Sequence, residues 1–498
     1  MLKSIKNMSI FIILLFLIYL FTYFESVRIW DNLWNFHFIQ GIETGLVPYR
    51  DMNLIVPPLF HFVGAFLFKL LGTNFYSFNI YGCLINTCIV VGILSLIRLY
   101  SNNKKVIILT IFITLIPLVL SQCANYNYMI IIFPIAILYL EKKQKNKNTY
   151  YNFLTGILLA LTALTKHTIG FVFIAAYLVY YLVNYIIEKK NSTENKQFKL
   201  KNLCFLILGI IVPLLLFLVY LITNRAFVDF INYCVGGIFE FSKKNSALTG
   251  LALPIIITFF ATFFSVIANS YKKDNCYLLL ILFSIASCFI AYPIANSYHM
   301  AVASIIPVAF LIITLYNVFI NFKEESKKIY KKALNFLCIS TILLVFILCI
   351  KKSLEVKTPY LLNNFDNELS VYNGNITITQ KDISAIKNIK DFINYKEKEG
   401  YNVIILSSDA SLYEIPYNVW HNDYDLLLNG NLGKKGIERV KSNLSSIQNP
   451  LFLKSNLGET NGQEIQEIED FVINNYTNIE SIEGLRVFVS KGVLNNGN

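Results

Sequence analysis

Long apolar runs separated by short polar loops dominate the chain. A first run at 9–24 is followed by ten more, at 78–99, 106–121, 127–140, 151–165, 168–187, 203–222, 251–269, 276–292, 300–320 and 333–350. An α-helix needs about 20 apolar residues to cross a bilayer, fewer where the membrane thins around it. The pattern predicts an α-helical polytopic membrane protein with about 11 transmembrane helices.

Two polar stretches interrupt this pattern and predict its organisation. The first, 25–77, contains an apolar run at 57–71 that is too short to cross, so we expect a juxtamembrane or re-entrant helix there. The second, 355–498, alternates helical and strand-like patterns. Its predicted elements are helices at 382–396, 435–444 and 463–475 and strands at 402–406, 450–454 and 485–491. We therefore predict a transmembrane domain at 1–354, with a first outer loop at 25–77, and a small α/β domain at 355–498.

The charge distribution predicts the orientation. Hydrophobic residues make up 55% of the 498, and the formal net charge is +12. With the 57–71 helix not spanning, 21 Lys and Arg residues fall in inside loops and seven in outside loops. Cytoplasmic loops favour Lys and Arg. This places the N-terminus in the cytoplasm and the C-terminal domain outside, and it explains the positive charge by membrane lipids rather than nucleic acid.

Asp31 is the first candidate for chemistry. It closely follows the first apolar run, and Trp30, Trp34 and Phe36 surround it in sequence. A partly desolvated carboxylate there could act as a general base on a bound hydroxyl or amine. The structural alternative is an interfacial helix cap, with the aromatic residues at headgroup level.

A turn motif, G-x-x-P-Y-R-D at 45–51, is the second candidate. The guanidinium of Arg50 and the phenol of Tyr49, beside Asp51, could hold a phosphate at the lipid surface. The alternative is an Arg50–Asp51 pair that simply fixes the turn.

Three basic residues next to apolar runs are further candidates. Lys166 and His167 lie between two runs, and His299 begins another. Ionisable residues at membrane depth are functional candidates, although Lys166 could also snorkel to headgroups and the histidines could be interfacial. His37 and His61 lack the spacing of two metal ligands on one helix, so we predict no metal and no cofactor; a divalent metal stays possible.

These motifs together resemble a known family. An Asp after the first helix, an aromatic amphipathic helix, G-x-x-P-Y-R-D, and P-P-L at 57–59 before an apolar helix resemble the GT-C superfamily of membrane glycosyltransferases. Protein O-mannosyltransferases and the aminoarabinose transferase acting on lipid A belong to it. The resemblance is most specific over about 20–75 and looser at 156–166 and 292–307.

The resemblance implies a fold, an activity and residue roles. It implies transfer of a hexose or pentose from a polyprenyl-phosphate donor to an envelope glycan, lipid or protein on the outer face. Asp31 would be the general base of an inverting displacement. Arg50, Lys166, His167 and His299 would face the leaving phosphate. Some relatives have Asp-Glu where this chain has Asp31-Asn32, which puts the role of that second carboxylate in doubt.

Other classes remain open. A flippase or transporter for a lipid-linked wall precursor would carry mid-span charges and matched halves, which are not evident here. A polymerase or ligase would use the same donors, and a non-enzymatic scaffold would look similar. The stretch 225–250 is predicted as an aromatic outer loop, either a gate over the donor or an interfacial belt.

Overall fold

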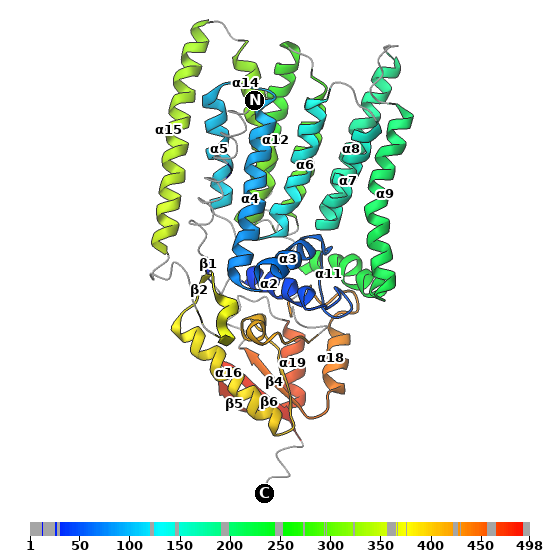
Figure 1. Ribbon diagram of the computed structural model, residues 1–498, viewed down its shortest axis with the longest axis vertical. Helices are drawn as coiled ribbons and strands as arrows, with labels where there is room; N and C mark the ends of the chain where they lie inside the picture. The colour runs from blue at the N-terminus through cyan, green and yellow to red at the C-terminus, as the bar shows by residue number, and fades with distance from the viewer. Residues whose placement is uncertain are drawn as a thin grey trace. The chain divides into compact units, whose positions relative to one another are not determined.

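The computed structural model describes most of the chain and divides it into two compact units (Figure 1). The described residues are 12, 25–26, 30–119, 124–144, 149–190, 199–244, 252–271, 274–292, 294, 296–321, 324–355, 365, 367–374, 376–421, 427–428, 430–455 and 465–491. One unit, here the helical unit, includes Asn79–Val219 and Ser246–Lys357. The other, the mixed unit, joins Glu25–Phe78, Tyr220–Asn245 and Thr358–Asn498. The predicted first outer loop thus belongs to the same compact unit as the C-terminal region.

Helices form at each of the ten predicted runs that the structure describes; the first run, at 9–24, lies outside the described residues. They are α4 (Phe75–Arg98), α5 (Lys104–Val119), α6 (Tyr126–Lys143), α7 (Thr149–Thr165), α8 (His167–Lys190), α9 (Leu200–Thr223), α12 (Ala252–Tyr271), α13 (Cys276–Cys288) with η3 (Phe289–Ala291), α14 (Ser297–Phe319) and α15 (Glu324–Glu355). Figure 1 shows α5, α14 and α15 running side by side. The apolar pattern therefore predicts these helices to within a few residues, apart from the longer α15.

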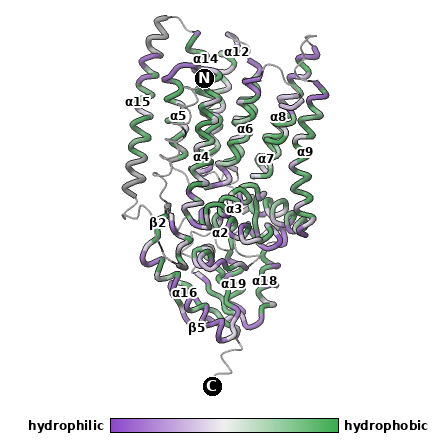
Figure 2. The backbone as a smooth tube through the Cα atoms, in the orientation of Figure 1, coloured by the Kyte–Doolittle hydropathy of each residue, from purple (hydrophilic) through white to green (hydrophobic). Residues whose placement is uncertain are grey.

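Six of the described helices are long and apolar enough to cross a membrane: α4, α8, α9, α12, α14 and α15. Most of α4 and α14 is buried inside the protein, whereas α9, α12 and α15 expose large apolar side chains along their length. Figure 2 shows that hydrophobic residues dominate these helices. Apolar side chains that face outward over a whole helix require a lipid solvent, so the chain is a polytopic membrane protein.

Glycine allows one close helix crossing in the helical unit. A Cβ on Gly156 of α7 would lie 2.2 Å from the carbonyl oxygen of Leu206, and one on Gly209 would lie 2.1 Å from that of Phe153. Small residues let two helix backbones approach in this way within a membrane. Helices α7 and α9 are thereby packed backbone to backbone.

Two short helices open the mixed unit. Helix α2 (Trp30–Glu43) packs against α3 (Leu59–Leu71), the apolar run predicted to be too short to span. Phe36 of α2 is fully buried, with its ring centroid 4.9 Å from that of Phe68 and 4.4 Å from that of Phe75. The contact with Phe68 joins α2 to α3, and the contact with Phe75 joins α2 to the start of α4.

The stretch predicted as an aromatic outer loop at 225–250 is helical from Phe227 to Lys244, and its position on the outer side stays a prediction. α10 (Phe227–Phe230), the π-helix η1 (Ile231–Gly236) and α11 (Gly237–Lys244) follow one another without a break. Asn232 explains how the segment is held: its side-chain Oδ1 accepts a hydrogen bond from the amide of Lys435, and its carbonyl accepts one from Lys434. A long-range contact that the sequence does not show thus orders the segment.

The C-terminal region contains a four-stranded mixed sheet in the order β3-β4-β6-β5. β3 (Asn402–Ile405) is parallel to β4 (Pro450–Ser455), while β6 (Leu485–Ser490) is antiparallel to β4 and to β5 (Tyr476–Ile482). A two-residue pair, β1 (Glu25–Ser26) and β2 (Ile376–Thr377), lies apart from it. The predicted strands β3, β4 and β6 are confirmed. β5 is missed because it is a largely exposed edge strand without an apolar alternation.

Helices complete the C-terminal region. α16 (Gln380–Lys398), α18 (Gly436–Ser446) and α19 (Gln466–Asn475) match the three predicted helices, and α17 (Ser411–Glu414), η4 (Asn367–Tyr372) and η5 (Ile415–Tyr417) are additional short turns. The core between sheet and helices is apolar and contains Phe452, Leu444, Val472 and Phe488. Figure 2 shows hydrophilic residues along α16 and β5, in contrast to the spanning helices. The expected α/β region is therefore present.

Candidate active site

Asp31 lies in the first turn of α2 and is half-buried. Its backbone carbonyl accepts a hydrogen bond of 2.7 Å from the Asn35 amide nitrogen, one turn later. A carboxylate in a first helical turn is favoured by the helix dipole, so the position suits a helix-starting residue as well as a base. Asn32, at the position where some relatives have Glu, is buried, with 3% of its surface exposed.

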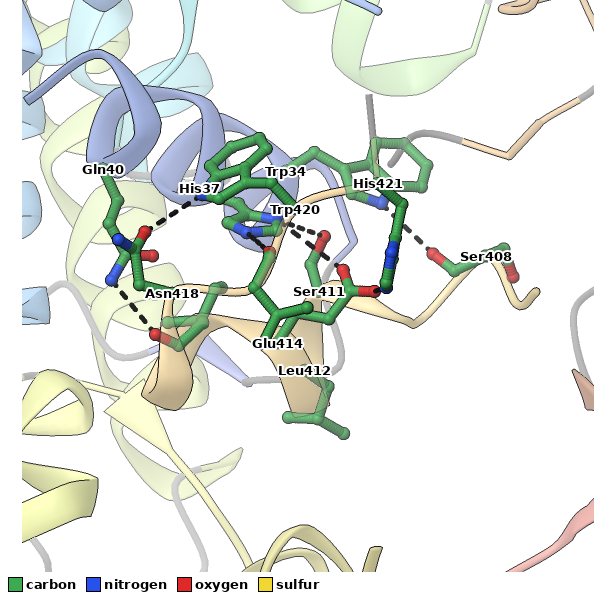
Figure 3. Close-up of polar contacts among 12 residues, drawn as sticks. Trp34, His37, Gln40, Ser408, Ser411, Leu412, Glu414, Asn418, Trp420 and His421 are labelled. Atoms are coloured by element: carbon green, nitrogen blue, oxygen red, sulfur yellow. Dashed lines mark hydrogen bonds and ion pairs between the residues drawn. The ribbon is translucent and has the colours of Figure 1, made fainter. Parts of the chain in front are cut away.

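The C-terminal segment 408–421 packs against α2 and forms hydrogen bonds with it (Figure 3). The indole Nε1 of Trp34 donates to the carbonyl of Ser408 at 3.1 Å, and the amide of Gln40 donates to the carbonyl of Ile415 at 3.0 Å. His37, between them, contacts the same segment at two points. Helix α2, which carries Asp31, is therefore held by residues almost 400 positions away in sequence.

The surroundings of His37 assign its tautomer. Its Nε2 lies 3.0 Å from the carbonyl of Val419, which can only accept, so Nε2 carries the hydrogen. Its Nδ1 then accepts from the hydroxyl of Ser411 at 3.3 Å. Burial lowers the pKa of His37 to about 3, against a weaker raising effect of the Val419 bond. The imidazole is thus a neutral hydrogen-bonding element at physiological pH.

Tyr49 of the predicted phosphate turn is a buried anchor. Only 1% of it is exposed, its hydroxyl donates to the carbonyl of Val56 at 2.9 Å, and its ring meets Phe230 edge-on. It adopts a positive φ of 73°, a conformation that non-glycine residues need support to keep. A substrate contact by Tyr49 stays a prediction, but the geometry supports a role in holding the turn.

Arg50 and Asp51 form the local pair that the structural alternative describes. Nε and Nη2 of Arg50 each lie 2.7 Å from a carboxylate oxygen of Asp51. Asp51 also accepts from the amide of Val47 at 2.8 Å, and Nη1 of Arg50 reaches the carbonyl of Asn224 at 3.3 Å. The hydrogen bond from Arg50 lowers the pKa of Asp51. The Arg50–Asp51 ion pair and the bond from Val47 therefore stabilise the turn.

In the helical unit, the structure brings Lys166 and His299 together. Nζ of Lys166, between α7 and α8, donates to Oδ1 of Asn127 at 2.8 Å and lies 5.7 Å from the ring centre of Tyr126. His299, in the first turn of α14, is close enough to interact electrostatically with Lys166, and its Nδ1 lies 2.8 Å from Oδ1 of Asn296.

The positive charge of Lys166 has no carboxylate partner among the described residues. His167 is the first residue of α8 and is half-buried beside Lys166. Of the predicted site residues, three basic ones belong to the helical unit: Lys166, His167 and His299. The others belong to the mixed unit: Asp31, Tyr49, Arg50 and Asp51. Within the part of the chain that the structure describes, no group of His, Cys, Asp or Glu side chains is arranged to hold a metal ion.

Two features of the site were not predicted from the sequence: the role of Asn127 and the contacts of segment 408–421 with α2. Asn127 follows Asn125, the N-cap of α6, whose side chain accepts from the Asn127 amide; the asparagine pair before an apolar run was the available signal. The grip of segment 408–421 on α2 had only a weak signal, the aromatic and polar residues of S-S-D-A-S-L-Y-E-I-P-Y-N-V-W-H at 407–421.

The comparisons with known proteins agree with this architecture. Residues 56–217 match the family model described as dolichyl-phosphate-mannose-protein mannosyltransferase. The structure of ArnT from Cupriavidus metallidurans bound to undecaprenyl phosphate is similar over 99% of both chains, with a TM-score of 0.53 and 12% identity. The chain therefore has an ArnT-like fold, and its residues 56–217 are similar to the mannosyltransferase family.

The apo structure of the same ArnT gives a TM-score of 0.55 at 10% identity over 98% of both chains. No curated protein matches this chain at a significant level. The matched family segment includes Lys166 and His167 but begins after Asp31 and the 45–51 turn. The comparisons thus show the fold, and a likeness to the mannosyltransferase family over 56–217.

Proposed function

We propose that this protein transfers a sugar from a polyprenyl-phosphate donor to a cell-envelope acceptor on the outer face of the membrane. The observation that carries the proposal is the family match at 56–217 on a chain whose whole fold is similar to that of ArnT, a protein solved with undecaprenyl phosphate. The transferred sugar is a hexose or a pentose, and the acceptor is a glycan, a lipid or a protein.

The reaction follows from the groups available. The carboxylate of Asp31 takes the proton of the acceptor nucleophile, which attacks the anomeric carbon of the donor. The bond from that carbon to the phosphate oxygen breaks, and the polyprenyl phosphate leaves with the electron pair. A single displacement of this kind inverts the anomeric configuration.

Asp51 is a weak candidate for the base. The carboxylate of Asp51 is occupied by Arg50 and the Val47 amide, and its lowered pKa makes it a poor proton acceptor. Asp31 is half-buried at the start of a helix that the C-terminal segment holds in place. A base needs this combination of a fixed position and access to solvent or substrate.

Lys166 is the strongest candidate for stabilising the charge on the leaving phosphate. Negative charge grows on the phosphate as the bond breaks, and a fixed cation aimed at it lowers the barrier. Lys166 is held by a neutral amide, and no described carboxylate neutralises its charge. His299 and His167, beside it, could add hydrogen bonds to the phosphate oxygens.

Deleting the gene and comparing envelope glycans, lipids and polyprenyl-phosphate sugars by mass spectrometry tests the proposal. We expect one sugar modification to disappear and its lipid-linked donor to accumulate, and the lost mass identifies a hexose or a pentose. Restoring the wild-type gene should reverse both changes, while an Asp31→Asn copy should reverse neither. Unchanged envelope glycans and donor pools would contradict transfer. An intact precursor held on the inner leaflet would instead indicate a flippase.

A further inference from the structure

The contacts of the C-terminal segment follow a single stripe along α2. Trp34, His37 and Gln40 are three residues apart, the spacing that brings side chains onto one helix face. Asp31 lies three residues before Trp34, one turn towards the N-terminus, and so is a neighbour of Trp34 on the helix surface. Gly41 extends the stripe at the other end, where any Cβ would lie 2.5 Å from the Trp420 ring.

The contacts along the stripe define the register of the helix. Trp34, His37 and Gln40 each donate to a backbone carbonyl, of Ser408, Val419 and Ile415 (Figure 3). A shift of α2 by one residue moves every side chain by about 1.5 Å along the axis and by more around it. Such a shift would break all three bonds together, so they select one position of the helix.

His37 is the most constrained of the three. Its ring stacks on that of Trp420 with centroids 3.7 Å apart, and both ring nitrogens have partners. Replacing the ring with a side chain of a different shape would open a gap against Trp420. Replacing it with a ring that lacks nitrogens would leave the Val419 carbonyl and Ser411 hydroxyl without this partner.

Glu414 lies near both His37 and His421. Its carboxylate is 3.9 Å from Nδ1 of His37 and 3.1 Å from Nε2 of His421, and only 2% of the side chain is exposed. Burial raises the pKa of Glu414, and His421 opposes that shift. A buried acid is costly unless it is paired, and the pair with His421 offsets that cost within the segment that contacts α2.

We propose that His37 and Glu414 are positioning residues for glycosyl transfer, which hold α2, and through it Asp31, in register on the C-terminal segment. The inference rests on the proposed function, in which Asp31 is the base. It gives the C-terminal region a role in positioning the base.

The test uses four variants of the full-length protein in lipid nanodiscs. His37→Phe keeps a ring to stack on Trp420 but removes both hydrogen bonds, and Glu414→Ala removes the buried acid. Glu414→Gln keeps the volume and an acceptor for His421. The matched control is Glu469→Ala, because Glu469 is an equally buried acid of the same region, paired with Lys454 and Arg486 and outside the α2 stripe.

Turnover is measured as release of undecaprenyl phosphate from a panel of synthetic undecaprenyl-phosphate hexoses and pentoses, with envelope extract as the acceptor source. Misplacing a catalytic group by about 1 Å can cost about 100-fold in rate. We expect kcat of His37→Phe and Glu414→Ala to fall about 10- to 100-fold per folded molecule, with donor KM nearly unchanged. Glu414→Gln should recover most of the rate. Glu469→Ala should lower the Tm without changing kcat per folded molecule.

Wild-type kcat in His37→Phe, or an equal loss in Glu469→Ala, would overturn the positioning role. An inactive Asp31→Asn beside a fully active His37→Phe would sink the positioning role alone, whereas a fully active Asp31→Asn would sink the proposed function itself. If Glu414→Ala does not fold, hydrogen exchange of α2 in His37→Phe decides: faster exchange at 31–37 supports the proposal, and wild-type exchange contradicts it.

Discussion

Lys166 and Arg50 are two basic residues that the sequence predicts alike, as contacts for the donor phosphate, and the structure separates them. Two nitrogens of the Arg50 guanidinium donate hydrogen bonds to Asp51, its neighbour in sequence, and the third donates to the Asn224 carbonyl. Lys166 donates to the neutral side chain of Asn127, in a cluster that also contains His299. The charge of Arg50 is neutralised within its own turn, whereas no carboxylate among the described residues pairs with Lys166.

The difference shows what makes a cation available to a ligand. A phosphate must displace Asp51 before it can use the fork of Arg50, and it gains little by exchanging one anion for another. A phosphate at Lys166 would pair with a cation that no described carboxylate neutralises, in partly buried surroundings where the interaction is strong. The predictions below test whether the two cations differ in function as they do in structure.

Lys166→Gln should have the largest effect. Gln can still bond to Asn127 but carries no charge for the departing phosphate. We expect kcat/KM for the polyprenyl-phosphate donor to fall about 100-fold or more, as when one transition-state donor is removed. Arg50→Gln, measured in parallel, should change it by less than about threefold. Equal losses in the two variants would show that the structural contrast has no functional meaning.

Tyr49→Phe should have an intermediate effect, on stability rather than on turnover. The substitution removes the bond from the buried hydroxyl to the Val56 carbonyl and leaves that carbonyl without this donor. We expect a loss of about 1 kcal/mol in the free energy of unfolding. Thermal unfolding in nanodiscs measures it, with kcat per folded molecule as the control. A fall in kcat at unchanged stability would instead indicate that Tyr49 contacts the substrate.

Asp51→Asn should have the smallest effect, and it should depend on pH. Because Arg50 holds the folded-state pKa of Asp51 below its unfolded value, the carboxylate stabilises the fold above about pH 4. That contribution is lost as the pH falls through the lower folded-state pKa. For a partly exposed pair we expect no more than about 1 kcal/mol at neutral pH. The stability difference between wild type and variant should be flat from pH 5 to 8 and shrink below about pH 4. A difference that grows on acidification would contradict the pairing.

Much of the fold follows from sequence because its causes are local. The helices of the helical unit come from apolar runs, and β3, β4 and β6 come from short buried segments. The segment around Asn232 could not be predicted, because a contact with Lys434 and Lys435 orders it. β5 was hidden because an edge strand with exposed side chains has no apolar alternation.

The candidate site was predictable as a set of residue types but not as a geometry. The sequence identifies Asp31, Arg50 and Lys166 by their chemistry and their place beside apolar runs. It does not show that Asp51 occupies Arg50, that Asn127 holds Lys166, or that His37 fixes α2 on Val419. The contacts of Lys166 and His37 are made by residues distant in sequence, so the sequence does not show them. The Arg50–Asp51 pair joins adjacent residues, and the sequence did offer it as an alternative.

The most direct test of the central claim is turnover by Asp31→Asn, measured together with binding of undecaprenyl phosphate by the same preparation. Asn preserves the size and shape of the side chain but cannot take a proton at neutral pH. We expect the variant to insert and to bind the lipid phosphate as wild type does, while sugar transfer falls to the background of an empty nanodisc. Wild-type turnover by Asp31→Asn would contradict it.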